Sequence, residues 1–214
     1  MSEPSAEPEV TSGVARSVVH PERRQFVANL IGAILWTAFA MLYLSSALSG
    51  GEILDLGLMV FYLIVAYLML ARRPVRREGA WWEQVLGWAS AAFPLVGFRP
   101  TPGDWPLAAI MLHGVGLAAM VYALATLGRS FAIAPADRGL VTRGPYRVVR
   151  HPMYAAELLS NAGFVLANLS WRNAVAMAVM LGTIVWRIAR EERIIAQYAD
   201  YAARVRWRLV PGVW

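Results

Sequence analysis

Residues 106–127 read PLAAIMLHGVGLAAMVYALATL and contain no Asp, Glu, Lys or Arg. An α-helix needs about 20 predominantly apolar residues to cross the hydrocarbon core of a bilayer, so this stretch is long enough to span one. The whole chain of 214 residues is 58% hydrophobic and 16% charged, and its mean hydropathy is +0.47. Soluble domains carry about 25% charged residues. The sequence therefore predicts an all-α integral membrane protein.

This stretch is one of six predominantly apolar segments in the chain, at residues 26–48, 53–71, 81–98, 106–127, 152–169 and 172–188. We therefore expect about six transmembrane helices. Only Ser170 and Trp171 separate the last two segments, which predicts a tight helical hairpin. The tail from Arg190 to Pro211 mixes Arg with apolar residues at helical spacing, which predicts an amphipathic helix along the membrane surface.

Three regions follow from this pattern. Residues 1–25, polar and acidic at their start, are predicted to be a disordered or interfacial N-terminus. Residues 26–127 are predicted to hold four transmembrane helices. Residues 128–214 hold the polar segment, the helical hairpin and the tail, and they are the expected functional region.

Arginine placement predicts the orientation. The chain has 20 basic residues, all of them Arg, and 18 fall on one side of the predicted topology, against Arg99 and Arg172 on the other. Basic residues concentrate in cytoplasmic loops, so both termini and the polar segment at residues 128–151 are expected in the cytoplasm. The use of Arg alone, with abundant Ala, Gly and Val, is typical of a GC-rich bacterial genome. We therefore expect a bacterial inner-membrane protein.

Composition also excludes several site classes. The chain has no Cys, which removes disulfides, thiolate metal sites and thiol nucleophiles. Its three His residues show no ligand spacing, so no metal site is expected. The net charge of +6 lies beside the apolar segments, where it meets anionic lipid head groups. No nucleic-acid partner is expected, and membrane lipids are.

The chemistry-bearing residues gather around one stretch. Residues 144–154 read GPYRVVRHPMY, and Arg187, Glu191 and Glu192 follow some 35 residues later. Gly and Pro residues break any helix before His151, which frees backbone groups to bind a polar ligand. Ionisable groups at the edge of a membrane span are functional by default. The alternative from these residues alone is an interfacial loop whose arginines contact lipid phosphates.

Arg187 stands out because its neighbours Ile184, Val185 and Ile188 are apolar, which predicts partial burial. It lies four residues before Glu191, so the two side chains share a helix face. A buried Arg requires a partner, and its planar fork suits a carboxylate.

At these residues the chain resembles the isoprenylcysteine carboxyl methyltransferases, integral membrane enzymes related to the phosphatidylethanolamine N-methyltransferases. The resemblance covers about residues 125–214. The residues that carry it, in chain order, are Leu140, Val141, Gly144, Tyr146, Arg150, His151, Pro152, Tyr154, Arg187, Glu191, Glu192, Tyr198, Tyr201 and Pro211. The segment after Glu192 is about five residues shorter than the family pattern.

The resemblance implies S-adenosylmethionine as methyl donor, bound by a cytoplasmic loop. The residues that match the family's cofactor contacts are Arg138, Gly139, Leu140, Val141, Tyr146, His151, Pro152, Met153, Tyr154 and Glu191. Arg187 matches the catalytic residue that contacts the substrate's carboxylate. The resemblance therefore predicts a methyltransferase with a lipophilic small molecule or lipid as acceptor.

The acceptor atom stays open at this point. Carboxyl O-methylation of an isoprenylcysteine-like or other lipophilic acid is the first expectation, because of Arg187. Phospholipid or amine N-methylation and thiol S-methylation are the alternatives within the enzyme class. A non-catalytic membrane protein that keeps the fold is the alternative outside it.

Overall fold

The computed structural model describes residues 21–51 and 53–214. Residues 1–20 of the predicted disordered or interfacial N-terminus (residues 1–25) lie outside them, and residues 21–25 form the start of α1. The α-helices are α1 (Pro21–Leu48), α2 (Ile53–Ala71), α3 (Trp81–Gly97), α4 (Leu107–Leu127), α5 (Pro152–Ala167), α6 (Trp171–Ile194) and α7 (Tyr198–Arg204). Short strands β1 (Arg77–Glu78) and β2 (Ala136–Asp137) pair antiparallel. Two 3-10 turns, η1 (Gly128–Ser130) and η2 (Gly144–Arg147), complete the order.

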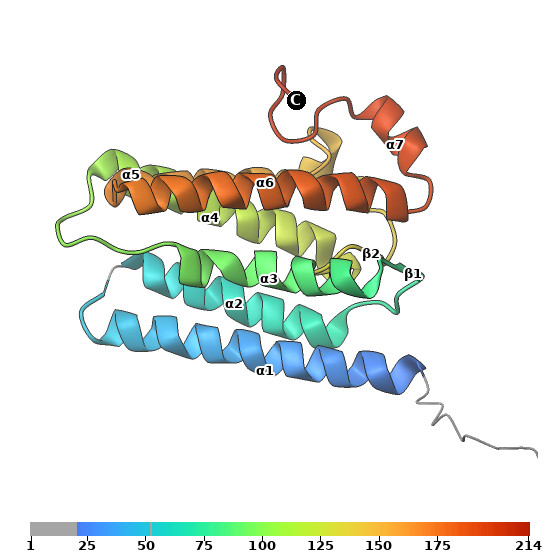
Figure 1. Cartoon of the computed structure of the whole chain (residues 1–214), viewed down its shortest axis with the longest axis horizontal. Helices are drawn as coiled ribbons and strands as arrows, with labels where there is room; N and C mark the ends of the chain where they lie inside the picture. Colours follow the sequence, from blue (N-terminus) through green and yellow to red (C-terminus); the bar gives the residue numbers. More distant parts are fainter. Residues whose placement is uncertain (1–20, 52) are drawn as a thin grey trace, which may run out of the picture.

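Helices α1 to α6 lie side by side as roughly parallel rods, and consecutive helices run in opposite directions (Figure 1). All connections therefore fall at two ends of the bundle. We call the end with residues 72–80, 128–151 and 195–214 the motif end, and the end with residues 49–51, 98–106 and 168–170 the distal end. The alternation brings the 128–151 segment and the C-terminal tail to the same end, as the sequence predicts.

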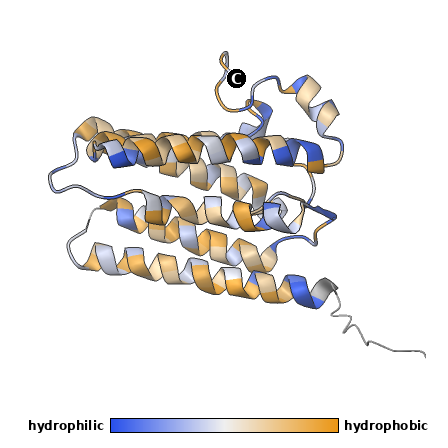
Figure 2. Ribbon diagram, in the orientation of Figure 1, coloured by the Kyte–Doolittle hydropathy of each residue, from blue (hydrophilic) through white to orange (hydrophobic). Residues whose placement is uncertain are grey.

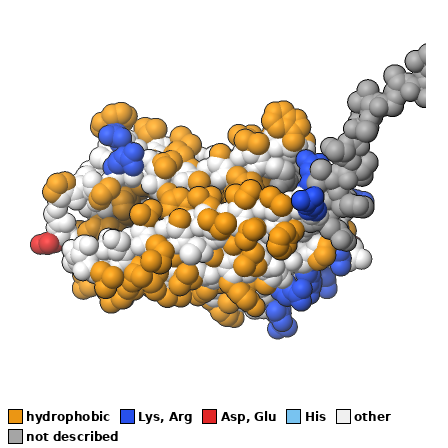
Figure 3. Space-filling view, turned by 90° about the horizontal axis from the view of Figure 1, so that it is seen from below, with side chains coloured by type: hydrophobic (Ala, Val, Ile, Leu, Met, Phe, Trp, Pro, Cys, Tyr) orange, Lys and Arg blue, Asp and Glu red, His pale blue; other side chains and the backbone are white. Residues whose placement is uncertain are grey.

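Four helices are long and apolar enough to cross a membrane: Arg23–Leu48, Ile53–Ala71, Leu107–Ser130 and Trp171–Ile194. Large apolar side chains are exposed along them, such as Ile34 and Leu42, both above 60%. Figure 2 shows the hydrophobic colouring along the rods. In Figure 3 apolar side chains cover the middle of one face, with arginines gathered towards its ends. This is the surface of a bundle that meets lipid rather than water.

Helices α3 and α5 are shorter, with 17 and 16 residues. At 1.5 Å per residue they are about 25 Å long, somewhat less than the roughly 30 Å hydrocarbon core. Six membrane crossings therefore remain a prediction.

The predicted amphipathic helix up to Pro211 is wrong. Helix α6 ends at Ile194, Gln197 adopts a left-handed backbone with φ of 60°, and α7 has only seven residues. The remaining tail turns back and binds the 149–151 segment, since Arg150 N–H donates to the Trp207 carbonyl at 2.8 Å and His151 N–H to the Arg208 carbonyl at 2.9 Å. These tertiary hydrogen bonds outweigh the helical pattern of the tail.

Helix α5 packs most closely against α4, although only residues 168–170 connect it to α6. Two glycines allow this approach. A Cβ on Gly116 would lie 2.3 Å from the Ser160 backbone nitrogen, and one on Gly163 would lie 2.4 Å from the His113 backbone nitrogen. The contact is therefore backbone to backbone, and it fixes His113 opposite Ser160.

Candidate active site

The polar segment between α4 and α5 is held at the motif end by short-range backbone geometry and one buried acid. Gly139 and Gly144 have φ of 98° and 57°, which favours glycine. Asp137 is buried, and its two oxygens accept from Gly139 N–H at 2.9 Å and from Ala196 N–H at 3.2 Å. One carboxylate thereby ties this segment to the link between α6 and α7.

A small cavity of about 80 Å³ lies where these segments meet. Nine of the ten residues predicted to bind a cofactor line it: Arg138, Gly139, Leu140, Val141, Tyr146, His151, Met153, Tyr154 and Glu191. The exception, Pro152, is the first residue of α5, where its fixed φ suits the start of a helix. Residues separated by up to 53 positions therefore meet around one space.

His151 lies between two tyrosines in this cavity. Its ring stacks on Tyr154 with centroids 5.7 Å apart and on Tyr198 with centroids 6.1 Å apart. Its Nε2 is 2.9 Å from the Tyr198 hydroxyl, and its Nδ1 is 3.8 Å from Glu191 Oε2. The imidazole therefore orients aromatic faces and one carboxylate around the cavity.

Glu191 and Glu192 have different roles. Glu192 is occupied by protein partners: Arg208 binds both of its oxygens at 3.0 Å, and Arg150 NH1 lies 3.1 Å from Oε1. Glu191 lines the cavity, accepts a hydrogen bond from the Tyr154 hydroxyl, and is 18% exposed. Glu192 anchors the tail, and Glu191 is the acid free to meet a ligand.

Arg138 and Tyr146 contribute a cation and a hydroxyl from the polar segment. The guanidinium of Arg138 donates to the Arg73 carbonyl, and burial lowers its pKa to about 10, so it stays charged at pH 7. Burial raises the pKa of Tyr146, and the negative charge of Glu191 raises it further. The Tyr146 hydroxyl therefore keeps its proton at neutral pH.

Arg187 is 3% exposed and does not pair directly with Glu191. Its NH2 donates to the Ile133 carbonyl at 2.6 Å, and its guanidinium lies 4.8 Å from the Tyr154 ring centroid. Glu191 and Glu157 both act on its charge electrostatically. The predicted burial of Arg187 is confirmed, but a backbone carbonyl and an aromatic face take the place of a bidentate carboxylate.

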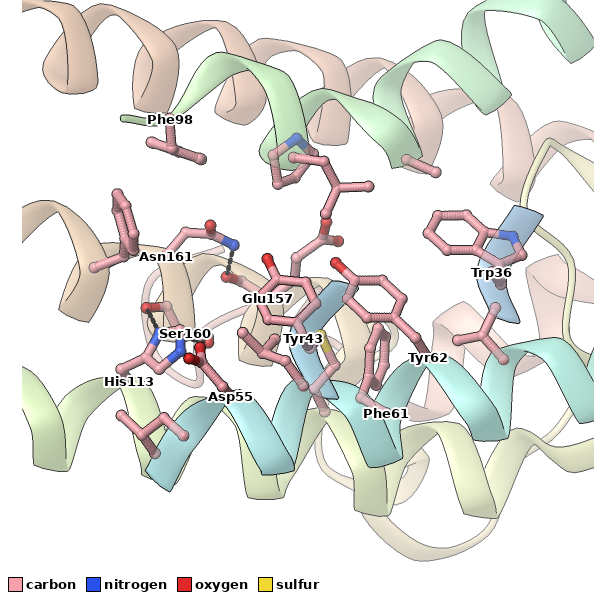
Figure 4. A pocket seen from close by; sticks show the side chains of 18 of the residues that line it. Trp36, Tyr43, Asp55, Phe61, Tyr62, Phe98, His113, Glu157, Ser160 and Asn161 are labelled. Atoms are coloured by element: carbon pink, nitrogen blue, oxygen red, sulfur yellow. Dashed lines mark hydrogen bonds between the residues drawn. The ribbon is translucent and has the colours of Figure 1, made fainter. Parts of the chain in front are cut away.

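A second, larger cavity of about 470 Å³ lies inside the bundle (Figure 4). This volume falls within the roughly 300–1,000 Å³ typical of small-molecule sites. Its aromatic walls come from α1, α2 and the end of α3, with Trp36, Tyr43, Tyr62 and Phe98 among them. Arg187 lines this cavity, and Met153 lines both cavities. The two spaces are therefore neighbours at the level of Met153.

Sequence reasoning missed most of the larger cavity. It also left Ser130, Ala132, Arg150 and Ile195 out of the smaller one. One signal was available: Asp55, His113 and Glu157 are ionisable residues inside apolar segments, and all three line the larger cavity. Tyr198 and Tyr201 belong to the resemblance, and the structure places both around the smaller cavity.

Comparison with known families identifies the part of the chain that builds this site. The model of the phospholipid methyltransferase family (PEMT) matches residues 106–200, from the start of α4 into α7. This range includes the polar segment, Arg187 and Glu191. No curated protein matches the chain. Residues 106–200 are therefore similar to the phospholipid methyltransferase family, and this match covers the part of the chain that builds the smaller cavity.

Proposed function

We propose that this chain is an integral-membrane methyltransferase that transfers a methyl group from S-adenosylmethionine to a lipophilic acceptor in the larger cavity. The observation that carries the proposal is the shared wall: Met153 lines both cavities, with Tyr154 on the polar side and Arg187 on the apolar side. A polar donor and an apolar acceptor can thus reach one wall from different sides. Holding two reactants in this way accounts for much of the rate of a displacement reaction.

The residues around the smaller cavity fit the proposed cofactor. S-adenosylmethionine supplies an electrophilic methyl group on a cationic sulfonium and also carries an amine, a carboxylate and an adenine. Glu191 and the tyrosine faces suit the cationic groups. Arg138 and Arg150 each have a buried Nε with no hydrogen-bond partner among the described residues, and these donors suit a carboxylate. Leu140 and Val141 offer apolar contact for the adenine.

The smaller cavity would have to widen to hold the whole cofactor, because about 80 Å³ is well below the usual volume of a ligand site. Helix α7 is the element suited to this movement. It contributes Tyr198 and Tyr201 to the wall, and residues 195–197 separate it from α6.

The test of the cofactor site is binding of S-adenosylmethionine to purified protein in detergent, measured by isothermal titration calorimetry. Glu191→Gln and His151→Ala should each weaken binding at least tenfold, which corresponds to about 1.4 kcal/mol. Asp200→Asn is the matched control, because Asp200 is an exposed acid on α7. Normal binding by both site variants would refute the assignment.

The charges near Arg187 favour an amine acceptor. Two carboxylates, Glu157 and Glu191, act on one guanidinium, which also donates to the Ile133 carbonyl. An additional carboxylate would compete with these two for the single guanidinium. An amine would meet complementary charge, and it must lose a proton to attack. The N–C bond would form as the C–S bond breaks, and Glu157, which lines the cavity, would accept the proton.

Carboxyl O-methylation is the second candidate, because Arg187 does line the acceptor cavity. The two candidate reactions predict different effects of the same two substitutions on turnover. With an amine acceptor, Glu157→Gln should lower kcat by about 10²–10⁴, the usual worth of a general base. With a carboxylate acceptor, Arg187→Lys should abolish turnover, since Lys lacks the two-donor fork, and Glu157→Gln should be tolerated. Turnover would be measured as radiolabelled methyl transfer into a lipid extract of the host.

We also propose that all six helices α1 to α6 cross the membrane, with the motif end in the cytoplasm. The 18-to-two arginine distribution supports this orientation. In that arrangement the smaller cavity faces the compartment that supplies the polar methyl donor.

A further inference from the structure

The distal part of the larger cavity is polar, although the cavity lies inside an apolar bundle. Asp55 from α2 and His113 from α4 both line it, as Figure 4 shows, and Asp55 acts electrostatically on His113. They are remote from the polar segment that forms the smaller cavity. Asp55 lies in the first turn of α2 and is partly buried, whereas His113 is buried. An ionisable side chain buried within a membrane span marks a site for a ligand or ion by default.

Both side chains present hydrogen-bond acceptors. His113 is 6% exposed, and its Nδ1 lies 2.8 Å from the Ser160 carbonyl. A carbonyl oxygen can only accept, so Nδ1 carries the proton and Nε2 has a free lone pair in the neutral ring. Asp55 receives one hydrogen bond, from the Ser46 hydroxyl at 2.7 Å, and has no ion pair within the described residues.

The α4–α5 contact makes this arrangement rigid. Gly116 approaches the Ser160 backbone, and Gly163 approaches the His113 backbone. The imidazole therefore cannot turn its Nδ1 towards the cavity without losing the Ser160 carbonyl. A hydrocarbon chain here would leave His113 Nε2 without a donor and Asp55 with the Ser46 hydroxyl alone, which is unfavourable in an apolar environment.

Helix geometry gives the distance from this polar pair to the shared wall. Ser160, which binds His113, is six residues beyond Tyr154 on α5, or about 9 Å at 1.5 Å per residue. The polar pair thus lies about 9 Å along α5 from the level of Tyr154.

We propose that Asp55 and His113 form a second subsite, which binds a hydroxyl or amino group at the far end of the acceptor. The acceptor is then a molecule with polar groups at both ends of an apolar spacer of about 10 Å, and a plain acyl or prenyl tail is excluded. This inference rests on the proposed function only in that the acceptor occupies the larger cavity.

The test compares 1-decanol with 1,10-decanediol, which differ by one terminal hydroxyl, by calorimetry on the full chain in detergent without cofactor. An entirely apolar cavity would bind the diol at least tenfold more weakly than the alcohol. The subsite predicts that the wild-type protein binds the diol as tightly as the alcohol or more tightly. With each affinity expressed on the free ligand concentration outside the detergent micelles, this sign needs no variant, so a variant that fails to fold does not affect it.

Variants then locate the effect. Asp55→Leu and His113→Phe should each shift the diol-to-alcohol affinity ratio at least tenfold towards the alcohol, and detergent partitioning cancels in that ratio. Leu58→Ala, in the apolar wall, is the control and should weaken both ligands equally. Weaker binding of the diol to the wild type, or an unchanged ratio in both variants, would overturn the subsite. Since no methyl transfer is involved, a failed methylation assay with a normal diol preference would instead refute the proposed function.

Discussion

Gly163→Ala tests the close approach of α4 and α5 with a single methyl group. The new Cβ would lie 2.4 Å from the His113 backbone nitrogen and 2.8 Å from the Ala109 carbonyl oxygen, whereas ordinary contacts begin at 3.4 Å. Backbone cannot rotate away as a side chain can, so the helices would have to separate by about 1 Å. Overpacking of this kind costs about 1–3 kcal/mol. The gain in helix propensity from Gly to Ala, about 1 kcal/mol, offsets part of this.

The matched control is Gly182→Ala on α6, where a Cβ meets nothing within 4 Å. Both variants would be heated in detergent, and the fraction of monodisperse protein followed by size exclusion. We expect Gly163→Ala to lose stability by several degrees, since about 1 kcal/mol shifts the Tm of a chain this size by 2–4 °C. Gly182→Ala should equal or exceed the wild type. Equal stability of the two variants would refute the backbone contact and the rigid placement of His113.

Three further predictions test other parts of the molecule. Glu192→Gln should make residues 205–214 sensitive to limited proteolysis, because it weakens the bonds to Arg150 and Arg208, while Glu191→Gln should not; equal sensitivity would contradict the separate roles of the two acids. Tyr201→Phe leaves the Tyr146 carbonyl without its 2.6 Å donor and should cost about 1–3 kcal/mol of stability, whereas Tyr67→Phe at an exposed position should be neutral. Asp104→Cys should be labelled by an impermeant thiol reagent from outside intact cells and Thr142→Cys only after lysis, and the reverse pattern would invert the proposed orientation.

The sequence predicts the helices and the smaller cavity for a common reason: both depend on residues near each other along the chain. Apolar runs determine helices directly. Residues 138–154 form most of one wall of the smaller cavity, so a contiguous motif locates it. Glu191 joins that wall because the alternation of six helices returns the end of α6 to the motif end.

The larger cavity depends instead on how helices rotate and pack. Trp36 and Tyr62 stack with centroids 5.4 Å apart across α1 and α2, yet apolar residues surround both in the sequence, so no pattern marks the face that points inward. The tail was predicted wrongly for a related reason. Its helical spacing is a local signal, whereas Glu192 and the backbone of residues 150 and 151 bind it through contacts distant in sequence.

The wall at Met153 has a kinetic consequence. Because separate cavities lead to it from its two sides, neither reactant blocks the other's path, and neither product must cross the other's binding space to leave. An enzyme built this way should follow a sequential mechanism through a ternary complex, with no covalent methyl-enzyme and no burst. Initial-rate plots against either substrate should then intersect, and parallel lines would show that the two ligands use one space in turn.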